Sequence, residues 1–278
     1  MKLNSITHIQ RLTLCLFLFS MLSCYKVDFE DYFHPDKTPK YCSIKKILSY
    51  NEYNIDTLVW TFNYNQWGDP HTVRLSNVST GRPEFQFFYD HHHRLTDFLG
   101  SYEGNRSFEF WHKYVYEGKK IVRDTVFIFG LIINGKPVVD PMSLHLTQVH
   151  SLEYDNYDRV IKNTIVYPYY SNVPVKVEEF TYTASGNLGR YKLTIPEFSY
   201  TQTDTTYTNY DNKVNLHRTH KIWMFIDRNY SMNNPAPAIS YNKYGLPNAF
   251  RSSALLADYD FIHVERNIAD SDIQYDCK

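Results

Sequence analysis

The sequence predicts an all-β protein, in which antiparallel β-hairpins repeat along one extended or curled sheet. Three observations lead to this prediction. Tyrosine and phenylalanine number 25 and 18 among 278 residues, and aromatic side chains favour strands over helices. Between Tyr64 and Tyr182, tyrosines followed by turn residues recur at intervals of about 25 to 38 residues, which is typical of repeat architectures. The residue types at fixed distances from these tyrosines also agree between repeats.

The clearest copy of the repeat is Leu152–Lys162, which reads as a strand, a tight turn and a returning strand. An apolar residue stands two positions before the repeat tyrosine and shares its strand face. A single hairpin is only marginally stable in water, so neighbouring hairpins have to pair or stack. The repeat tyrosines are Tyr64, Tyr89, Tyr154, Tyr182 and Tyr241, with a shorter copy at Tyr116.

The fourth residue after each repeat tyrosine marks the turn. Three copies have glycine there, namely Gly68, Gly186 and Gly245, and the other two have His93 and Asp158. A short hairpin loop usually needs one residue at positive φ, which glycine adopts without steric cost and which His and Asp tolerate. The alternative is a generic all-β chain whose turns share these residues by chance.

Other segments refine the expected strands. Pro70 and Pro247 open two returning strands, which therefore need no N–H donor at that position. The long interval between Tyr116 and Tyr154 predicts an extra hairpin, with a turn at Asn134–Pro137. Late in the chain we expect strands over 219–226 and 260–266 and a helical turn over 248–258.

Several segments resemble YD repeats, the hairpin units of RHS-like proteins, and these are 62–68, 89–90, 154–160 and 180–182. Three later segments, 210–215, 231–235 and 241–247, are similar to a family of Bacteroidetes-type lipoproteins that is classified as a domain of unknown function. The resemblance covers most of the chain after residue 42, and it implies an extracytoplasmic β-rich fold without an agreed activity. Val214 departs from the pattern, because a turn glycine would stand there.

Residues 1–23 read as a lipoprotein signal peptide. Lys2 and Arg11 supply positive charge, and the apolar run 12–19 is too short to span a bilayer stably. The segment closes on Met21-Leu22-Ser23-Cys24, which resembles a lipobox, in which Cys24 is acylated and becomes the new N-terminus. Cleavage by an ordinary signal peptidase, or an uncleaved anchor, is the alternative.

Residues 24–41 then form an acidic tether, and residues 42–278 form the β domain. The acidic residues after Cys24 resemble a surface-export signal, and an ordinary hydrophilic spacer is the alternative. We therefore expect an outer-membrane lipoprotein on the periplasmic or the cell-surface side. Cys42 and Cys277 flank the domain and are available to form a disulfide in an oxidising compartment, or they remain free thiols.

The sequence contains no motif that specifies a reaction. Nucleophile elbow, zinc-protease, phosphate-loop and dinucleotide patterns are absent, so we predict no catalytic residue, metal ligand or cofactor. His91, His92 and His93 are adjacent and cannot readily share one metal ion, because successive strand side chains alternate between faces. His217 and His220 lack companion ligands at metal-site spacing. The net charge of −1, without a basic block, gives no electrostatic case for nucleic acid.

Carboxylates for a glycosidase would need a defined separation across a cleft, which sequence cannot show. We interpret the acidic residues that could serve as such carboxylates as solvated strand and turn residues. These residues are Glu178, Glu179, Asp227, Asp258 and Asp260. The aromatic surplus is the better functional indication, because exposed rings suit sugars or partner proteins, although a sheet also packs such rings against itself. The tryptophans are Trp60, Trp67, Trp111 and Trp223.

The predicted function is therefore that of a lipid-anchored cell-envelope protein which binds glycan or protein, or acts as a scaffold for them. A glycan-active enzyme and a purely structural envelope component are the alternatives. An exposed apolar patch would favour binding, and a pocket with converging carboxylates would favour catalysis.

Overall fold

The structure, a computed structural model, describes residues 42–50, 57–102, 104, 106–170, 172–251, 261–262 and 270–277. Within these residues sixteen strands form one sheet, and its antiparallel pairing confirms the fold class that the sequence predicts. The strands of the first half are β1 (Cys42–Ser49), β2 (Leu58–Tyr64), β3 (Pro70–Leu75), β4 (Glu84–Tyr89), β5 (Leu95–Ser101), β6 (Ser107–Glu117), β7 (Lys120–Ile133) and β8 (Lys136–Val139). Those of the second half are β9 (Gln148–Tyr154), β10 (Val160–Val166), β11 (Lys176–Tyr182), β12 (Leu188–Ile195), β13 (Tyr200–Thr206), β14 (Ser240–Tyr241), β15 (Pro247–Arg251) and β16 (Asp270–Cys277).

Helical structure is confined to short pieces. The 3-10 helices are η1 (Pro141–Leu146), η2 (Pro196–Phe198) and η3 (Leu216–Thr219), and α3 (Lys221–Ile226) is an α-helix. No helix in the described ranges is long and apolar enough to cross a membrane.

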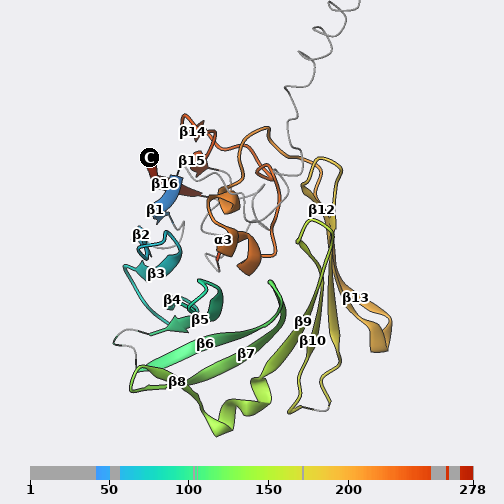
Figure 1. Ribbon diagram of the computed structural model, residues 1–278. Coiled ribbons are helices and arrows are strands. Elements are labelled where there is room, and N and C mark those ends of the chain that lie inside the picture. The colour runs from blue at the N-terminus through green and yellow to red at the C-terminus, as the bar shows by residue number, and fades with distance from the viewer. Residues whose placement is uncertain are drawn as a thin grey trace, which may run out of the picture.

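The strand order shows how the hairpins join. Neighbours run β13-β12-β11-β10-β9-β7-β6-β5-β4-β3-β2-β1-β16-β15-β14, and β8 pairs with β7 as the predicted extra hairpin. β16 pairs with β1, which brings the last described strand beside the first. The sheet curves around the segment that contains α3, and β13 and β14 lie at its two open ends (Figure 1).

The ends of the β domain are joined covalently. Cys42 and Cys277 are register partners on β1 and β16 and form a disulfide with an S–S distance of 2.08 Å. The side-chain amide of Asn242, in the turn between β14 and β15, lies 3.8 Å from the Cys42 sulfur. The disulfide therefore lies at the same rim of the sheet as the hairpin turns.

The turns have the backbone that the repeat requires. φ is 88° at Gly68, 81° at Gly186 and 80° at Gly245, and it is 58° at both His93 and Asp158. All five residues are thus in the left-handed region, which glycine adopts without cost.

In four of the turns, the residue after the repeat tyrosine holds the turn together. Asn65 Oδ1 accepts hydrogen bonds from the backbone N–H groups of Trp67 and Asp69, at 2.9 and 3.0 Å. A short side-chain acceptor bonding the backbone two residues later is an Asx-turn. The same pair of bonds occurs at Asp90, Asp155 and Asn242.

The repeat tyrosines link successive hairpins. Tyr89 donates its hydroxyl hydrogen bond to the carbonyl of Pro70, the first residue of the preceding returning strand, over 2.6 Å. Tyr64, Tyr116 and Tyr154 donate in the same way to the carbonyls of Ile44, Leu95 and Ile121. Two tyrosines outside the repeats, Tyr210 and Tyr275, donate to the carbonyls of Leu188 and Pro247. These four repeat tyrosines therefore pack against the core and also form a polar link to a neighbouring strand.

The prediction of a strand over 219–226 is wrong, because η3 and α3 occupy this segment. The His220 side chain caps α3 by accepting a hydrogen bond from the Ile222 N–H. Residues 222–225 are all buried, and a short fully buried apolar run fits a helix as well as a strand. Trp223 packs edge-on against Phe62 and Phe87 with ring centroids 5.7 and 5.5 Å apart, inside the curve of the sheet.

Two further predictions for the late chain need correction. Pro247–Arg251 is strand β15, so the described part of the predicted helical turn at 248–258 is extended. Phe261 and Ile262, the described part of the predicted strand at 260–266, form a bend and a turn and are buried in the core. The remaining residues of both segments lie outside the described ranges.

Candidate functional site

Only one of the four tryptophans is available to a ligand. Trp60 and Trp223 are 1% and 0% exposed. Trp111 is half-buried, and its indole N–H donates to Asp97 over 2.8 Å. Trp67 is 61% exposed. Self-packing of the sheet thus accounts for the first three rings and leaves Trp67 as the candidate.

Trp67 lies in the turn between β2 and β3, and the neighbouring turn supports its ring. The His93 ring centroid is 4.3 Å from that of Trp67, with an angle of 57° between the rings. His93 is held in place by its left-handed backbone and by its N–H, which donates to the Asp90 carbonyl. The exposed indole therefore has a defined position.

The hairpin turns form a continuous edge of the sheet, which we call the turn rim and which comprises residues 65–69, 90–94, 117–119, 155–159, 183–187 and 242–246. Adjacent turns contact one another. Arg94 donates to the Gly118 carbonyl over 3.3 Å, and Lys120 forms an ion pair with Asp158 at 2.7 Å. Strands are about 4.8 Å apart, so successive turns follow at roughly 10 Å along this rim.

A ring side chain recurs on the turn rim at the third residue after the repeat tyrosine. Trp67, His92, Tyr157 and Tyr244 occupy this position in four of the turns. Tyr157 is 42% exposed. Sequence analysis missed this position, although aligning the repeats on their tyrosines would have shown it.

Asp69 and His220 form a pair beside the Trp67 turn, with His220 Nε2 lying 3.5 Å from Asp69 Oδ1. His220 Nδ1 accepts from the Ile222 N–H, so Nε2 carries the proton that faces Asp69. Burial lowers the pKa of His220, which therefore stays neutral near pH 7. Burial alone would raise the pKa of Asp69, but the hydrogen bond from His220, with the charge of Lys221 and a hydrogen bond from Asn65, lowers it overall. Asp69 is 9% exposed, so this pair fixes the start of α3 to the Trp67 turn from inside the fold.

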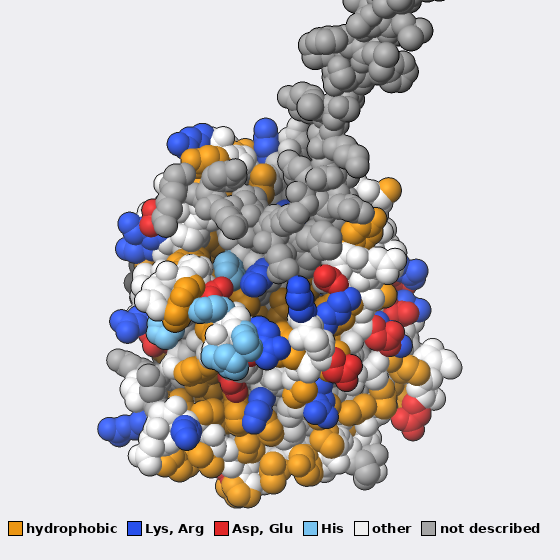
Figure 2. Space-filling model, viewed as in Figure 1, with side chains coloured by type: hydrophobic (Ala, Val, Ile, Leu, Met, Phe, Trp, Pro, Cys, Tyr) orange, Lys and Arg blue, Asp and Glu red, His pale blue; other side chains and the backbone are white. Residues whose placement is uncertain are grey.

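The three adjacent histidines occupy the turn between β4 and β5. The ring centroids of His91 and His92 are 3.8 Å apart, and His93 turns to Trp67. Among the residues that the structure describes, no group of three or more His, Cys, Asp or Glu side chains could hold a metal ion. Figure 2 shows histidine side chains gathered on one face, with lysine and arginine side chains beside them.

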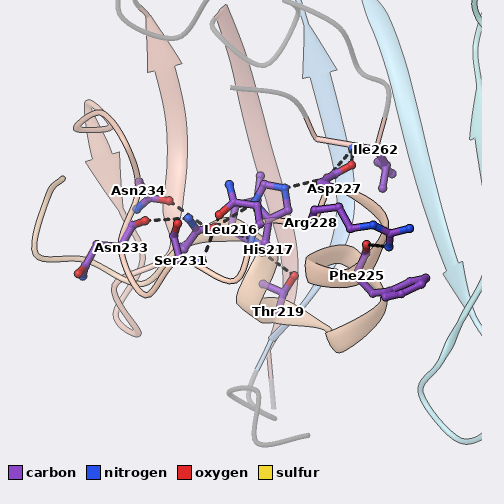
Figure 3. Close-up of polar contacts among 12 residues, drawn as sticks. Leu216, His217, Thr219, Phe225, Asp227, Arg228, Ser231, Asn233, Asn234 and Ile262 are labelled. Carbon is purple, nitrogen blue, oxygen red and sulfur yellow. Dashed lines mark hydrogen bonds and ion pairs between the residues drawn. The ribbon is translucent and has the colours of Figure 1, made fainter. Parts of the chain in front are cut away.

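His217 and Asp227 belong to a buried network in the C-terminal segment (Figure 3). His217 Nε2 lies 2.7 Å from Asp227 Oδ2, and its Nδ1 lies 3.0 Å from Asn215 Oδ1. Asp227 also accepts from the Ile262 N–H at 2.8 Å. His217 is 0% exposed, so this pair fastens residues 215, 227 and 262 together inside the fold and has no access to a ligand.

A second polar network lies on the inner face of the sheet. Asp124 on β7 is 1% exposed and accepts from His112 Nδ1 at 2.9 Å, with Arg228 3.6 Å away. Burial opposes ionisation of Asp124, but His112 and Arg228 outweigh it and lower its pKa. Asp124 therefore attaches the C-terminal segment to the sheet through an ion pair.

This network continues across β9 to β12. Asn163 Nδ2 donates to His150 Nδ1 over 3.0 Å and to Glu178 Oε2 over 2.6 Å. Tyr191 donates to the other oxygen of Glu178 over 2.8 Å. Both Glu178 oxygens are thus occupied, and no hydrogen bond within the described ranges joins Glu178 to Asp227. Glu179 is exposed, and Asp258 and Asp260 lie outside the described residues.

Comparison with known proteins does not place the chain in a family. No family model matches it, and no curated protein matches. A solved structure, the crystal structure of TcdB2-TccC3-Cdc42, is similar with 14% sequence identity and a TM-score of 0.20. The similarity covers 68% of this chain and 11% of that chain. At this TM-score the similarity is too weak to assign fold or function, and the resemblance to YD-repeat lipoproteins stays a prediction.

Proposed function

We propose that this chain is a lipid-anchored binding module of the cell envelope, which takes a glycan ligand on the turn rim around Trp67. Lipid on Cys24 would hold the protein on the outer membrane, at its periplasmic or cell-surface side. The observation that carries the glycan proposal is the 61% exposed indole of Trp67, supported by His93 at 4.3 Å. A flat, pre-positioned aromatic ring offers a sugar a stacking surface at low entropic cost.

Polar groups near the ring suit a hydroxylated ligand. His91 and His92 are exposed and occupy the adjacent turn. Asp69 is buried and pairs with His220, so it supports the turn from inside the fold. Tyr157 and Tyr244 repeat the ring position farther along the turn rim, as subsites for an extended chain would require. Binding is proposed ahead of glycan hydrolysis because Glu178 and Asp227 are both engaged in structural hydrogen bonds.

The test of glycan binding compares Trp67→Ala with Trp67→Phe and with Ile239→Ala, which removes an exposed side chain outside the turn rim. Binding to immobilised xylan, mannan and pectin is measured by affinity electrophoresis. We expect Trp67→Ala to lose about tenfold or more in affinity, the equivalent of about 1.4 kcal/mol. Trp67→Phe should retain part of the binding, and Ile239→Ala all of it. Equal affinity of all the variants for the polysaccharides would reject the proposal. Failure of the parent protein to bind any of the three polysaccharides would reject it as well.

Anchoring is tested separately. Replacement of Cys24 by Ala should move the protein from the membrane fraction to the soluble fraction of the cell. An unchanged membrane fraction would contradict acylation at Cys24. Protease treatment of intact cells then distinguishes the cell surface from the periplasm.

A further inference from the structure

The extra hairpin and η1 carry a group of exposed apolar side chains, which we call the apolar tip. Its members are Phe129 (42% exposed), Leu131 (54%), Ile133 (51%), Val138 (44%) and Met142 (79%). They come from β7, β8 and η1, the segment inserted between the regular repeats. Figure 2 shows hydrophobic side chains along the lower edge of the molecule, where Figure 1 places β8 and η1.

The backbone of the apolar tip has an unusual conformation at Phe129, close packing at Gly130 and a capped helix start at Asp140. Phe129 has φ of 54°, a conformation that bulky residues rarely adopt, and its ring remains 42% exposed. Gly130 allows close packing beside it, because a Cβ there would lie 2.3 Å from the Phe108 ring and 2.6 Å from the Val138 carbonyl oxygen. Asp140 caps η1 by accepting from the Met142 N–H at 2.9 Å. A strained residue that displays an apolar ring to solvent indicates a role outside the core.

The border of the apolar tip carries aromatic and cationic residues. Tyr169 and Tyr170 are 61% and 48% exposed, and the Tyr170 ring centroid lies 6.2 Å from that of His145 in η1. Lys136 is exposed at the end of the hairpin and pairs with Ile133 on one edge of β7. Arg106 is exposed on the other edge of β7, where its carbonyl accepts from the Ile132 N–H at 2.9 Å. The border thus combines phenol rings with positive charge.

We propose that the apolar tip inserts into the interfacial layer of an anionic phospholipid bilayer. Aliphatic side chains at the centre, tyrosines at the border and nearby cations are the composition that such an interface favours. The hot spots of protein–protein interfaces have a different composition from the apolar tip, because they are enriched in Trp, Tyr and Arg at their centre and poor in Leu and Val. The exposed cations match the sign of an anionic lipid surface.

This second membrane contact is compatible with the proposed anchor. Seventeen residues, 25–41, separate Cys24 from Cys42. A chain of this length spans at most about 60 Å, so acyl chains on Cys24 do not restrict which face of the domain meets the bilayer. Contact through the apolar tip would then fix the orientation of a domain that the acyl chains only hold nearby.

The experiment uses the full chain with Cys24→Ala, so that acylation cannot cause binding, and vesicles of phosphatidylcholine with or without phosphatidylglycerol. Co-sedimentation should show binding that is stronger with phosphatidylglycerol and weaker at high salt. The double variant Leu131→Ser/Ile133→Ser should bind at least about tenfold more weakly, since burying each side chain is worth more than about 1.4 kcal/mol. Lys136→Glu should lower binding about fivefold on the anionic vesicles only.

Two controls separate folding from binding. Phe129→Gly removes the ring and the unfavourable backbone conformation together, so it should weaken vesicle binding while leaving thermal stability unchanged or higher. Ile239→Ser changes an equally exposed apolar residue elsewhere, 66% exposed, and should leave binding unchanged. The proposal is overturned by absence of vesicle binding in the parent chain, by equal effects of Ile239→Ser, or by dimerisation that the Leu131→Ser/Ile133→Ser variant abolishes. The glycan assay does not use this surface, so each proposal can fail alone.

Discussion

The hydroxyl of Tyr182 donates a hydrogen bond to the carbonyl of Arg228 over 3.1 Å. The preceding repeat tyrosine, Tyr154, instead bonds Ile121 at the start of the neighbouring returning strand. By that pattern Tyr182 would bond Val160 at the start of β10, but its partner is Arg228 of the C-terminal segment. The exchange inserts the C-terminal segment into the row of hairpins and holds it inside the curved sheet.

The tyrosine links should contribute measurably to stability. Tyr89→Phe removes the bond to the carbonyl of buried Pro70 and leaves that acceptor without its partner. We expect a loss of about 1–2 kcal/mol in the free energy of unfolding, measured by urea denaturation. Tyr169→Phe, at an exposed ring, is the matched control and should change the free energy little. Equal effects of the two variants would show that the hydroxyl link is not the cause.

The turn glycines should matter through backbone conformation alone. At Gly68, with φ of 88°, a Cβ would meet no atom within 4 Å, so Gly68→Ala introduces no clash. The cost of the left-handed conformation predicts a loss of about 1–2 kcal/mol. Gly68→Asn should lose less, since Asn tolerates this region. Thermal unfolding in which Ala and Asn cost the same would argue against this explanation.

The disulfide should stabilise the folded state by restricting the unfolded chain. Cys42 and Cys277 are 235 residues apart in sequence. For a closed loop of this size the chain-entropy model gives about 5 kcal/mol. The double variant Cys42→Ala/Cys277→Ala should therefore unfold at much lower urea concentration, and the parent protein under reducing conditions should match it. Cys24→Ala, measured as the control, should unfold like the parent.

Mild acid should destabilise the fold through His150. Burial, with the charges of His112 and Arg228, lowers the pKa of His150 from 6.5 to about 4 despite the opposing effect of Asp124. Between pH 6.5 and pH 4 the unfolded state therefore binds one more proton at this residue, and stability falls as the pH falls through this window. The loss is about 3 kcal/mol at most, since a tenfold change in proton affinity is worth about 1.4 kcal/mol.

The measurement compares urea unfolding at pH 7 and pH 4.5 for the parent and for His150→Gln. Glutamine does not titrate in this range, so the variant should lose less stability on acidification than the parent does. His220 also titrates with a lowered pKa, and its contribution remains in both proteins. An identical pH dependence in parent and variant would rule out His150 as the source.

Much of the fold could be predicted from local chemistry. A hairpin turn is specified within a few residues, so Gly68, His93 and Asp158 could be identified from spacing alone, and the structure gives all three positive φ. The extra hairpin could be expected from the long interval between Tyr116 and Tyr154. Strand 219–226 was predicted wrongly, because four successive buried residues have no preferred period and only their surroundings decide between helix and strand.

The candidate site depended on the tertiary structure to a greater extent. The sequence by itself determined that tryptophans and histidines were available and that turns would recur; Trp60 stands among apolar residues and Trp67 among polar turn residues, but the sequence did not show which ring other segments cover. Only the folded sheet decides which ring is covered, because burial results from contacts between segments far apart in the chain. In the same way, Asp124 meets Arg228, and Cys42 meets Cys277, only after the sheet has curved and brought its last strands back to its first.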